Sequence, residues 1–89
     1  MSLFDRFRPM WRHSNPDVRK IAVKGLTDEE VLTRIAENDE DPFVREGAVA
    51  KLTSRATLAQ IARTDQHPAV RSTAVSQLDD PALLAELAV

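Results

Sequence analysis

Apolar side chains recur along this chain every three or four residues, which is the spacing of one helix face rather than of a strand. The clearest stretch is DPFVREGAVAKL, residues 41–52. Asp41 and Pro42 open it as a helix N-cap and a proline at the first helical position do. Its apolar stripe consists of Val44, Ala48, Val49 and Leu52. The pattern predicts a short amphipathic helix that begins at Pro42.

The same stretch has a copy on each side, so the chain is internally repeated. Its prolines stand at the evenly spaced positions 16, 42 and 68, and a fixed period of that size is the signature of a repeat architecture. The copies define repeats 15–40, 41–66 and 67–89, the last of which stops short of a full period. The matching stripes are Val18, Ala22, Val23 and Leu26 in the first repeat, and Val70, Ala74, Val75 and Leu78 in the third.

Each repeat contains a second apolar stripe at helical spacing. The stripes are Leu32, Ile35 and Ala36, then Leu58, Ile61 and Ala62, then Leu84, Leu87 and Ala88. The second helices are expected to begin near Thr27 or Asp28, near Thr53 or Ser54, and near Asp80, because these residue types cap helices. Helices of about ten residues are marginal alone in water and need packing to persist. The sequence therefore predicts an all-α domain, an α-α superhelix of three two-helix repeats with about six short helices.

Residues 1–14 differ from the repeats and are expected to form an N-terminal capping segment. They hold three of the four aromatic residues, Phe4, Phe7 and Trp11, and three arginines against one aspartate. A terminal repeat has one unpaired apolar face that must be covered for solubility, and these aromatic side chains are large enough to cover it. The alternative is an anchor for a membrane surface or a partner, because aromatic residues among arginines suit an interface.

Bulk composition narrows the class of protein. The chain has 89 residues, of which 43% are hydrophobic and 29% charged, and its net charge of −2 argues against general affinity for nucleic acid. It has no cysteine, which removes disulfides and thiolate chemistry and is compatible with the cytoplasm. No apolar run approaches the length of a membrane span, and no secretory signal is readable. A cytoplasmic domain with no membrane span is the resulting expectation.

The repeats resemble HEAT-like repeats. The resemblance rests on Pro-x-Val-Arg-x-x-Ala-Val-x-x-Leu followed by Leu-x-x-Ile/Leu-Ala, and it covers residues 15–89. The resemblance is strongest for the short bacterial versions. The Val-Arg and Leu-x-x-Ile-Ala patterns are also similar to those of leucine-rich-variant repeats. HEAT repeats usually run about 40–47 residues, so the shorter period here implies a second helix that is abbreviated or partly 3₁₀. The family implies a right-handed α-solenoid that serves as a protein-interaction scaffold.

The resemblance also gives a meaning to one arginine in each repeat, Arg19, Arg45 and Arg71. In HEAT-like repeats the arginine at this place bonds a nearby acid and forms a ladder between repeats. Asp39 precedes Arg45 by six positions and Asp65 precedes Arg71 by six, whereas His13 takes the equivalent place before Arg19. We therefore expect Asp39 to pair with Arg45, and the ladder to lack its first acid. The functional alternative is a row of phosphate-binding arginines.

A binding surface is expected on the second helices, which commonly form the inner face of a solenoid. Their outward positions differ between repeats, as positions that determine specificity do, although plain solvent exposure produces the same variation. Phe43 replaces Asp17 and Ala69 at the matching position, outside the apolar stripe, where it is either a partly covered surface aromatic or an anchor for a partner. The candidate partner-binding residues are Phe43, Arg34, Glu37, Gln60 and Arg63.

Nothing in the sequence predicts catalysis or a cofactor. His13 and His67 share no repeat position and have no neighbouring ligand cluster, and no zinc spacing, glycine-rich phosphate loop or catalytic triad order is present. The acidic run at 37–41 lacks the spaced ligands and central glycine of a calcium loop. A relative's iron–sulfur cluster would need cysteines that this chain does not have.

The expected function is a non-catalytic protein–protein interaction scaffold or adaptor. Two alternatives stay open. Some HEAT-like relatives act in bilin attachment, so the chain could be an auxiliary factor for a cofactor-attaching enzyme. The last residues, LLAELAV, are apolar and no polar capping repeat follows, so the C-terminal end is also a candidate surface for a homodimer or for end-to-end assembly.

Overall fold

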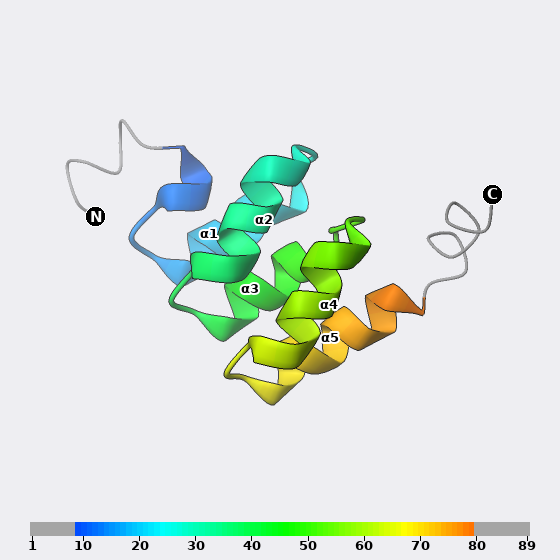
Figure 1. Ribbon diagram of the computed structural model, residues 1–89. Coiled ribbons are helices and arrows are strands. Elements are labelled where there is room, and N and C mark those ends of the chain that lie inside the picture. Colours follow the sequence, from blue (N-terminus) through cyan, green and yellow to red (C-terminus); the bar gives the residue numbers. More distant parts are fainter. Residues whose placement is uncertain (1–8, 80–89) are drawn as a thin grey trace.

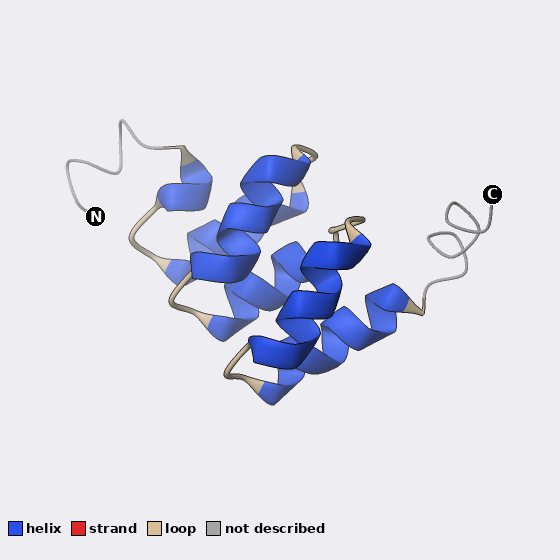
Figure 2. Ribbon diagram, in the orientation of Figure 1, coloured by secondary structure: helices blue, strands red, loops and turns tan. Residues whose placement is uncertain are grey.

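The computed structural model describes residues 9–79, and every regular element within that range is a helix (Figure 1 and Figure 2). One short 3₁₀ helix precedes five α-helices. In chain order the elements are η2 (Met10–Arg12), α1 (Pro16–Lys24), α2 (Glu29–Asn38), α3 (Pro42–Val49), α4 (Arg55–Thr64) and α5 (Pro68–Leu78). The all-α prediction is confirmed for these residues. The sixth expected helix, which would begin near Asp80, lies outside the described residues.

The first helix of each repeat begins at the expected cap. The side chain of Asn15 accepts a hydrogen bond from the Asp17 amide at 2.9 Å, and Asp41 caps α3 in the same way. His67 also serves as a cap, because its Nδ1 accepts from the Ala69 amide at 3.2 Å. In all three helices a proline follows the cap at a position whose N–H would have no helical partner.

The second helices are α-helical from end to end in the two repeats where they are described. Asp28 caps α2 by accepting from the amides of Glu30 and Val31, so Asp28 rather than Thr27 is the cap. Ser54 caps α4 by accepting from the Thr57 amide. The short period therefore does not convert α2 or α4 to 3₁₀ geometry.

The helices form two layers. The first helices of the repeats, α1, α3 and α5, lie side by side in that order, and α2 and α4 cover one face of this row (Figure 1). Helix α2 packs mainly against α3, and α4 packs mainly against α5. Each second helix thus contacts the first helix of the following repeat, which ties consecutive repeats together.

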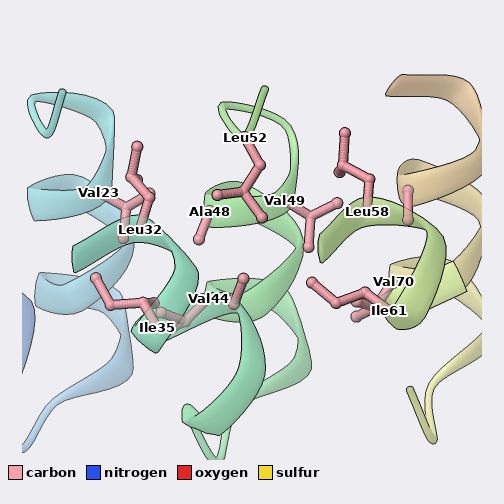
Figure 3. Close-up of a cluster of buried hydrophobic side chains, with 12 residues drawn as sticks. Val23, Leu32, Ile35, Val44, Ala48, Val49, Leu52, Leu58, Ile61 and Val70 are labelled. Atoms are coloured by element: carbon pink, nitrogen blue, oxygen red, sulfur yellow. The ribbon is translucent and has the colours of Figure 1, made fainter. Parts of the chain in front are cut away.

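The core lies between the layers and is built from the predicted stripes (Figure 3). The middle repeat is the most completely buried, because it has neighbours on both sides. Val49 is fully buried, whereas its counterpart Val75 is 49% exposed. The prediction that Val75 extends the apolar stripe into the core is therefore wrong, since no described element covers that side of α5. The buried set comprises Val23, Leu32, Ile35, Ala36, Val44, Ala48, Val49, Leu52, Leu58, Ile61, Val70 and Ala74.

At the other end of the row, η2 contacts α1, and Trp11 packs partly buried against the core. Trp11 is the one expected capping residue that the structure describes, since Phe4 and Phe7 lie outside the described residues. Across residues 9–79, no helix combines the length and the apolar character needed to cross a bilayer.

Candidate functional site

Two arginine–aspartate pairs, Arg19 with Asp39 and Arg45 with Asp65, join consecutive repeats. The Asp39 carboxylate accepts from Arg19 Nε at 2.9 Å and from Nη2 at 3.1 Å. The Asp65 carboxylate accepts from Arg45 Nε and Nη2 at 3.0 and 3.2 Å. In both pairs the arginine side chain is 14% exposed and the aspartate 8% exposed. Such two-point pairing of planar groups fixes orientation as well as charge.

The pairing corrects our expectation about which acid binds which arginine. We expected Asp39 to pair with Arg45, six positions later, but its carboxylate binds Arg19, in the preceding first helix. Arg45 contacts the backbone of Asp39 instead, because its Nη1 donates to the Asp39 carbonyl oxygen at 2.7 Å. The physical reason is that Asp39 follows the end of α2, which packs against the next repeat. Its side chain therefore reaches back to α1 while its carbonyl faces α3.

Each arginine consequently donates to a backbone carbonyl six positions earlier in the sequence. In the first two repeats it also donates to an aspartate carboxylate 20 positions later. Arg19 Nη1 donates to the His13 carbonyl at 2.8 Å, and Arg71 Nη1 donates to the Asp65 carbonyl at 2.6 Å. These are the upstream positions that the spacing singled out. The spacing therefore identified the correct residue six positions before each arginine. The contact uses the backbone carbonyl of that residue, whereas we had expected its side chain.

The acids of the ladder also shape the turn before each first helix. Asp39 Oδ1 accepts from the Asp41 amide and Asp65 Oδ1 from the His67 amide, both at 2.9 Å. His13 fills the same place in the first repeat, because its Nδ1 accepts from the Asn15 amide at 3.0 Å. His13 thus accepts in this turn the hydrogen bond that Asp39 and Asp65 accept in the later turns. The expectation that the ladder lacks its first acid is wrong, because Arg19 pairs with Asp39.

The environment of Asp65 favours the charged form. Burial, the largest single influence, works to raise the pKa of this carboxyl group. The hydrogen bonds from Arg45 and from the His67 amide, with the positive charge of Arg45, outweigh burial and hold the pKa of Asp65 below its ordinary value. The Asp65 carboxyl group is therefore ionised at neutral pH, and it pairs with the Arg45 guanidinium group. Because carboxylates and carbonyls already occupy the Arg19 and Arg45 guanidinium groups, this geometry does not favour phosphate binding by a row of arginines.

Two pockets open next to the ladder on the side of α2 and α4. The η2–α2 pocket, of about 590 Å³, is lined by Trp11, Arg12, His13, Ser14, Arg19, Arg34, Ile35, Asn38, Asp39 and Glu40. The α2–α4 pocket, of about 350 Å³, is lined by Ala36, Glu37, Arg45, Gln60, Ile61, Thr64, Asp65 and Gln66. Every lining position of the second pocket except Ala36 corresponds to a lining position of the first, one repeat earlier. A pocket with matching lining positions is therefore present twice, once beside Arg19 and Asp39 and once beside Arg45 and Asp65.

The five candidate partner-binding residues do not share one site. Arg34 lines the η2–α2 pocket, and Glu37 and Gln60 line the α2–α4 pocket, so the structure brings these three to one surface. Arg63 is exposed on α4 but lines neither pocket. Phe43 is 51% exposed and lies elsewhere, beside a third pocket of about 370 Å³ between α1 and α3.

Two bracing residues were missed by the sequence argument. Glu29 Oε1 accepts from the amides of Thr53 and Ser54 at 2.6 and 3.0 Å, and so links the start of α2 to the turn before α4. Lys51 Nζ donates to the carbonyls of Val23 and Lys24 at 3.0 and 2.8 Å, at the C-terminal end of α1. Neither residue recurs at its repeat position, so the period gave no signal for them.

Within residues 9–79, no three histidine, aspartate or glutamate side chains gather as a metal site requires. Four charged side chains that line the two pockets, Arg19, Asp39, Arg45 and Asp65, form the two ion pairs of the ladder. A search of protein-family models gives no match to this chain, and no curated protein or solved structure matches it either.

Proposed function

We propose that this chain is a non-catalytic protein–protein interaction scaffold built from HEAT-like repeats, and that it holds an extended segment of a partner protein across α2 and α4. The observation that carries the proposal is the recurrence of one pocket in consecutive repeats, at matching positions. A polypeptide is itself periodic, so a surface with regularly spaced hollows suits it better than a single compact ligand.

The pair of pockets combines constant and variable positions. Both share an arginine and an aspartate of the ladder and a buried isoleucine, Ile35 or Ile61. The exchanged positions change chemistry: Arg34 becomes Gln60, and Trp11 becomes Glu37. Constant positions preserve the shape and variable positions supply selectivity, which is how solenoid repeats recognise partners.

The helix arrangement supports an α-solenoid as the underlying architecture. First helices in one row, second helices on one face and an identical inter-repeat ion pair are what stacked two-helix repeats produce (Figure 1). The Trp11 side chain supports a capping role for residues 1–14, because it packs on the core beside α1. Assembly through the C-terminal end would use Leu84 and Leu87, which lie outside the described residues, and no described feature favours a bilin-attachment role.

The test is site-specific photocrosslinking with the full chain in cells that encode it. A photoreactive residue replaces Gln60 in one variant and Arg34 in another, and Ser72, exposed on α5, carries it in the matched control. We expect Gln60 and Arg34 to crosslink to the same partner protein, and Ser72 to give no such product.

Three outcomes would contradict the proposal. Crosslinking from Ser72 as strong as from Gln60 would place the contact elsewhere. Crosslinks only to further copies of this chain would favour self-assembly over a scaffold for a different partner. A complete lack of protein crosslinks at both pocket positions would remove the basis for a scaffold role of α2 and α4.

A further inference from the structure

The pocket between α1 and α3, here called the lysine pocket, lies apart from the two repeated pockets and shares no lining residue with them. Helix α1 contributes Lys20, Val23 and Lys24, and α3 together with the turn after it contributes Phe43, Gly47 and Lys51. Lys20 Nζ lies 5.6 Å from the centre of the Phe43 ring. The pocket thus combines apolar surface with three positive charges.

Three positions on the α3 side of the pocket carry a different residue in every repeat. Phe43, Gly47 and Lys51 follow each other at intervals of four, which places them along one stripe. The equivalent residues are Asp17, Ile21 and Gly25 in the first repeat, and Ala69, Thr73 and Gln77 in the third. The core positions of the same helices keep their apolar character, whereas these three positions change in size, polarity and charge.

Gly47 is the most informative of these three residues. Glycine is unfavourable in a helix interior, and here nothing in the backbone requires it. A Cβ atom at this position would meet Val23 Cγ1 at 3.7 Å, an ordinary contact, and no described glycine has a positive φ. Its effect is to leave space between α1 and α3.

The next interface along the row shows what fills that space elsewhere. Between α3 and α5, Thr73 takes the position of Gly47, and its hydroxyl donates to Glu46 Oε2 at 3.0 Å. Lys20 is the counterpart of Glu46 in the first repeat. Glu46 and Thr73 therefore fill the space between α3 and α5, whereas Lys20 and Gly47 leave the space between α1 and α3 open.

The charge around the lysine pocket is positive although the whole chain carries −2. No acidic residue lines it. Asp17 contacts Lys20 at 3.6 Å. Glu46 accepts a hydrogen bond from the Thr73 hydroxyl, and Glu29 accepts from the turn before α4. Lys51 is held by backbone carbonyls, which do not neutralise its charge. Among the described residues, Lys24 has no ion-pair partner.

We propose that the lysine pocket binds an acidic segment of a partner polypeptide, which inserts one large aliphatic side chain between α1 and α3 beside Phe43. Charge complementarity selects the acidic flanks, and a half-exposed aromatic ring beside a hollow is the environment in which interface anchors concentrate. The site is separate from the α2 and α4 surface, so it would persist if the scaffold function proposed above failed.

The test is an NMR titration of the ¹⁵N-labelled chain with a blocked peptide in which single leucines separate pairs of glutamates. Two matched peptides replace glutamate by glutamine or leucine by alanine. We expect saturable shifts centred on the amides of Lys20, Gly47 and Lys51. Each matched peptide should bind at least about tenfold more weakly, and added salt should weaken binding of the acidic peptide.

Variants of the chain separate the pocket from general charge. Gly47→Leu fills the space and should reduce affinity about tenfold or more. If that variant loses its fold, Lys20→Gln/Lys24→Gln gives a second test of the same site, with a similar expected loss. Arg55→Gln, on exposed α4 surface outside the three pockets, should leave affinity within about twofold of wild type.

Several results would overturn the inference. Absence of saturable shifts at the lysine pocket, or equal binding of the glutamine peptide, excludes an acidic ligand. Shifts centred on Gln60 instead would support the α2 and α4 surface and remove this site. Binding to phosphatidylserine vesicles that Gly47→Leu abolishes, without peptide binding, would reassign the pocket to an anionic membrane surface.

Discussion

The carboxylate of Asp39 accepts two hydrogen bonds from the guanidinium group of Arg19, which lies in the preceding first helix. Arg45 and Asp65 form the same pair one repeat later. The carboxylate oxygens lie 2.9 and 3.1 Å from Nε and Nη2 in the first pair, and 3.0 and 3.2 Å from them in the second. Each pair is largely buried and spans two repeats, so it fixes the position of one repeat relative to the next. Loss of one partner would leave the other charge largely buried without its counter-ion.

A double-mutant cycle of Arg19→Gln and Asp39→Asn tests this assignment by urea unfolding. We expect Asp39→Asn alone to lower the free energy of unfolding by about 2–4 kcal/mol, because it leaves the Arg19 charge unpaired. The coupling energy between the two changes should exceed about 1 kcal/mol.

The matched cycle combines Asp39→Asn with Arg45→Gln. Arg45 contacts the backbone carbonyl of Asp39, which both variants retain, so this coupling should be the smaller of the two. A larger coupling to Arg45 than to Arg19 would restore the pairing that the sequence spacing favoured.

The lowered pKa of Asp65 predicts how its contribution to stability depends on pH. Because the folded pKa lies below the ordinary value of 3.8, the ionised group stabilises the fold at pH values above 3.8. That contribution is lost as the pH falls from there through the folded pKa. The difference in unfolding free energy between wild type and Asp65→Asn should therefore be constant from pH 7 to about 5 and shrink in more acidic solution. A difference that grows below pH 4 would show that the folded pKa is raised instead.

The start of α2 distinguishes two neighbouring cap candidates. Asp28 accepts from the Glu30 and Val31 amides, so Asp28→Ala should destabilise the chain by about 1 kcal/mol. Thr27→Ala is the control and should change the unfolding free energy by less than about 0.5 kcal/mol. Thermal unfolding followed by circular dichroism measures both, and equal effects would mean that Thr27 shares the capping role.

Gly47→Ala should stabilise the fold. The added Cβ has room beside Val23, and replacing glycine in a helix interior gains about 0.5–1 kcal/mol. Gly25→Ala is the matched control, because Gly25 has α-helical φ and ψ but sits at the C-cap of α1, where the gain should be smaller. Denaturant unfolding compares the two. A destabilised Gly47→Ala would show that α1 and α3 need closer approach than the structure indicates.

Local chemistry and period let the sequence predict most of the helical elements. Asn15, Asp41 and His67 before proline mark the first helices, because an N-cap and a first-turn proline act within a few residues of each other. Core residues such as Val44 and Leu58 follow from the helical spacing of one apolar face. The exposure of Val75 could not be predicted from that spacing, because burial depends on which element packs against a helix face.

The sequence by itself determined that this chain forms short capped helices in a regular repeat, with one arginine in each repeat beside the apolar stripe. Only the tertiary structure decided that Asp39 binds Arg19, that the pocket beside the ladder recurs, and that Gly47 leaves space near Phe43. The physical reason is range. Caps and stripes depend on neighbours within two helical turns, whereas an ion pair or a pocket depends on which helices pack together and on the direction in which each side chain leaves its own.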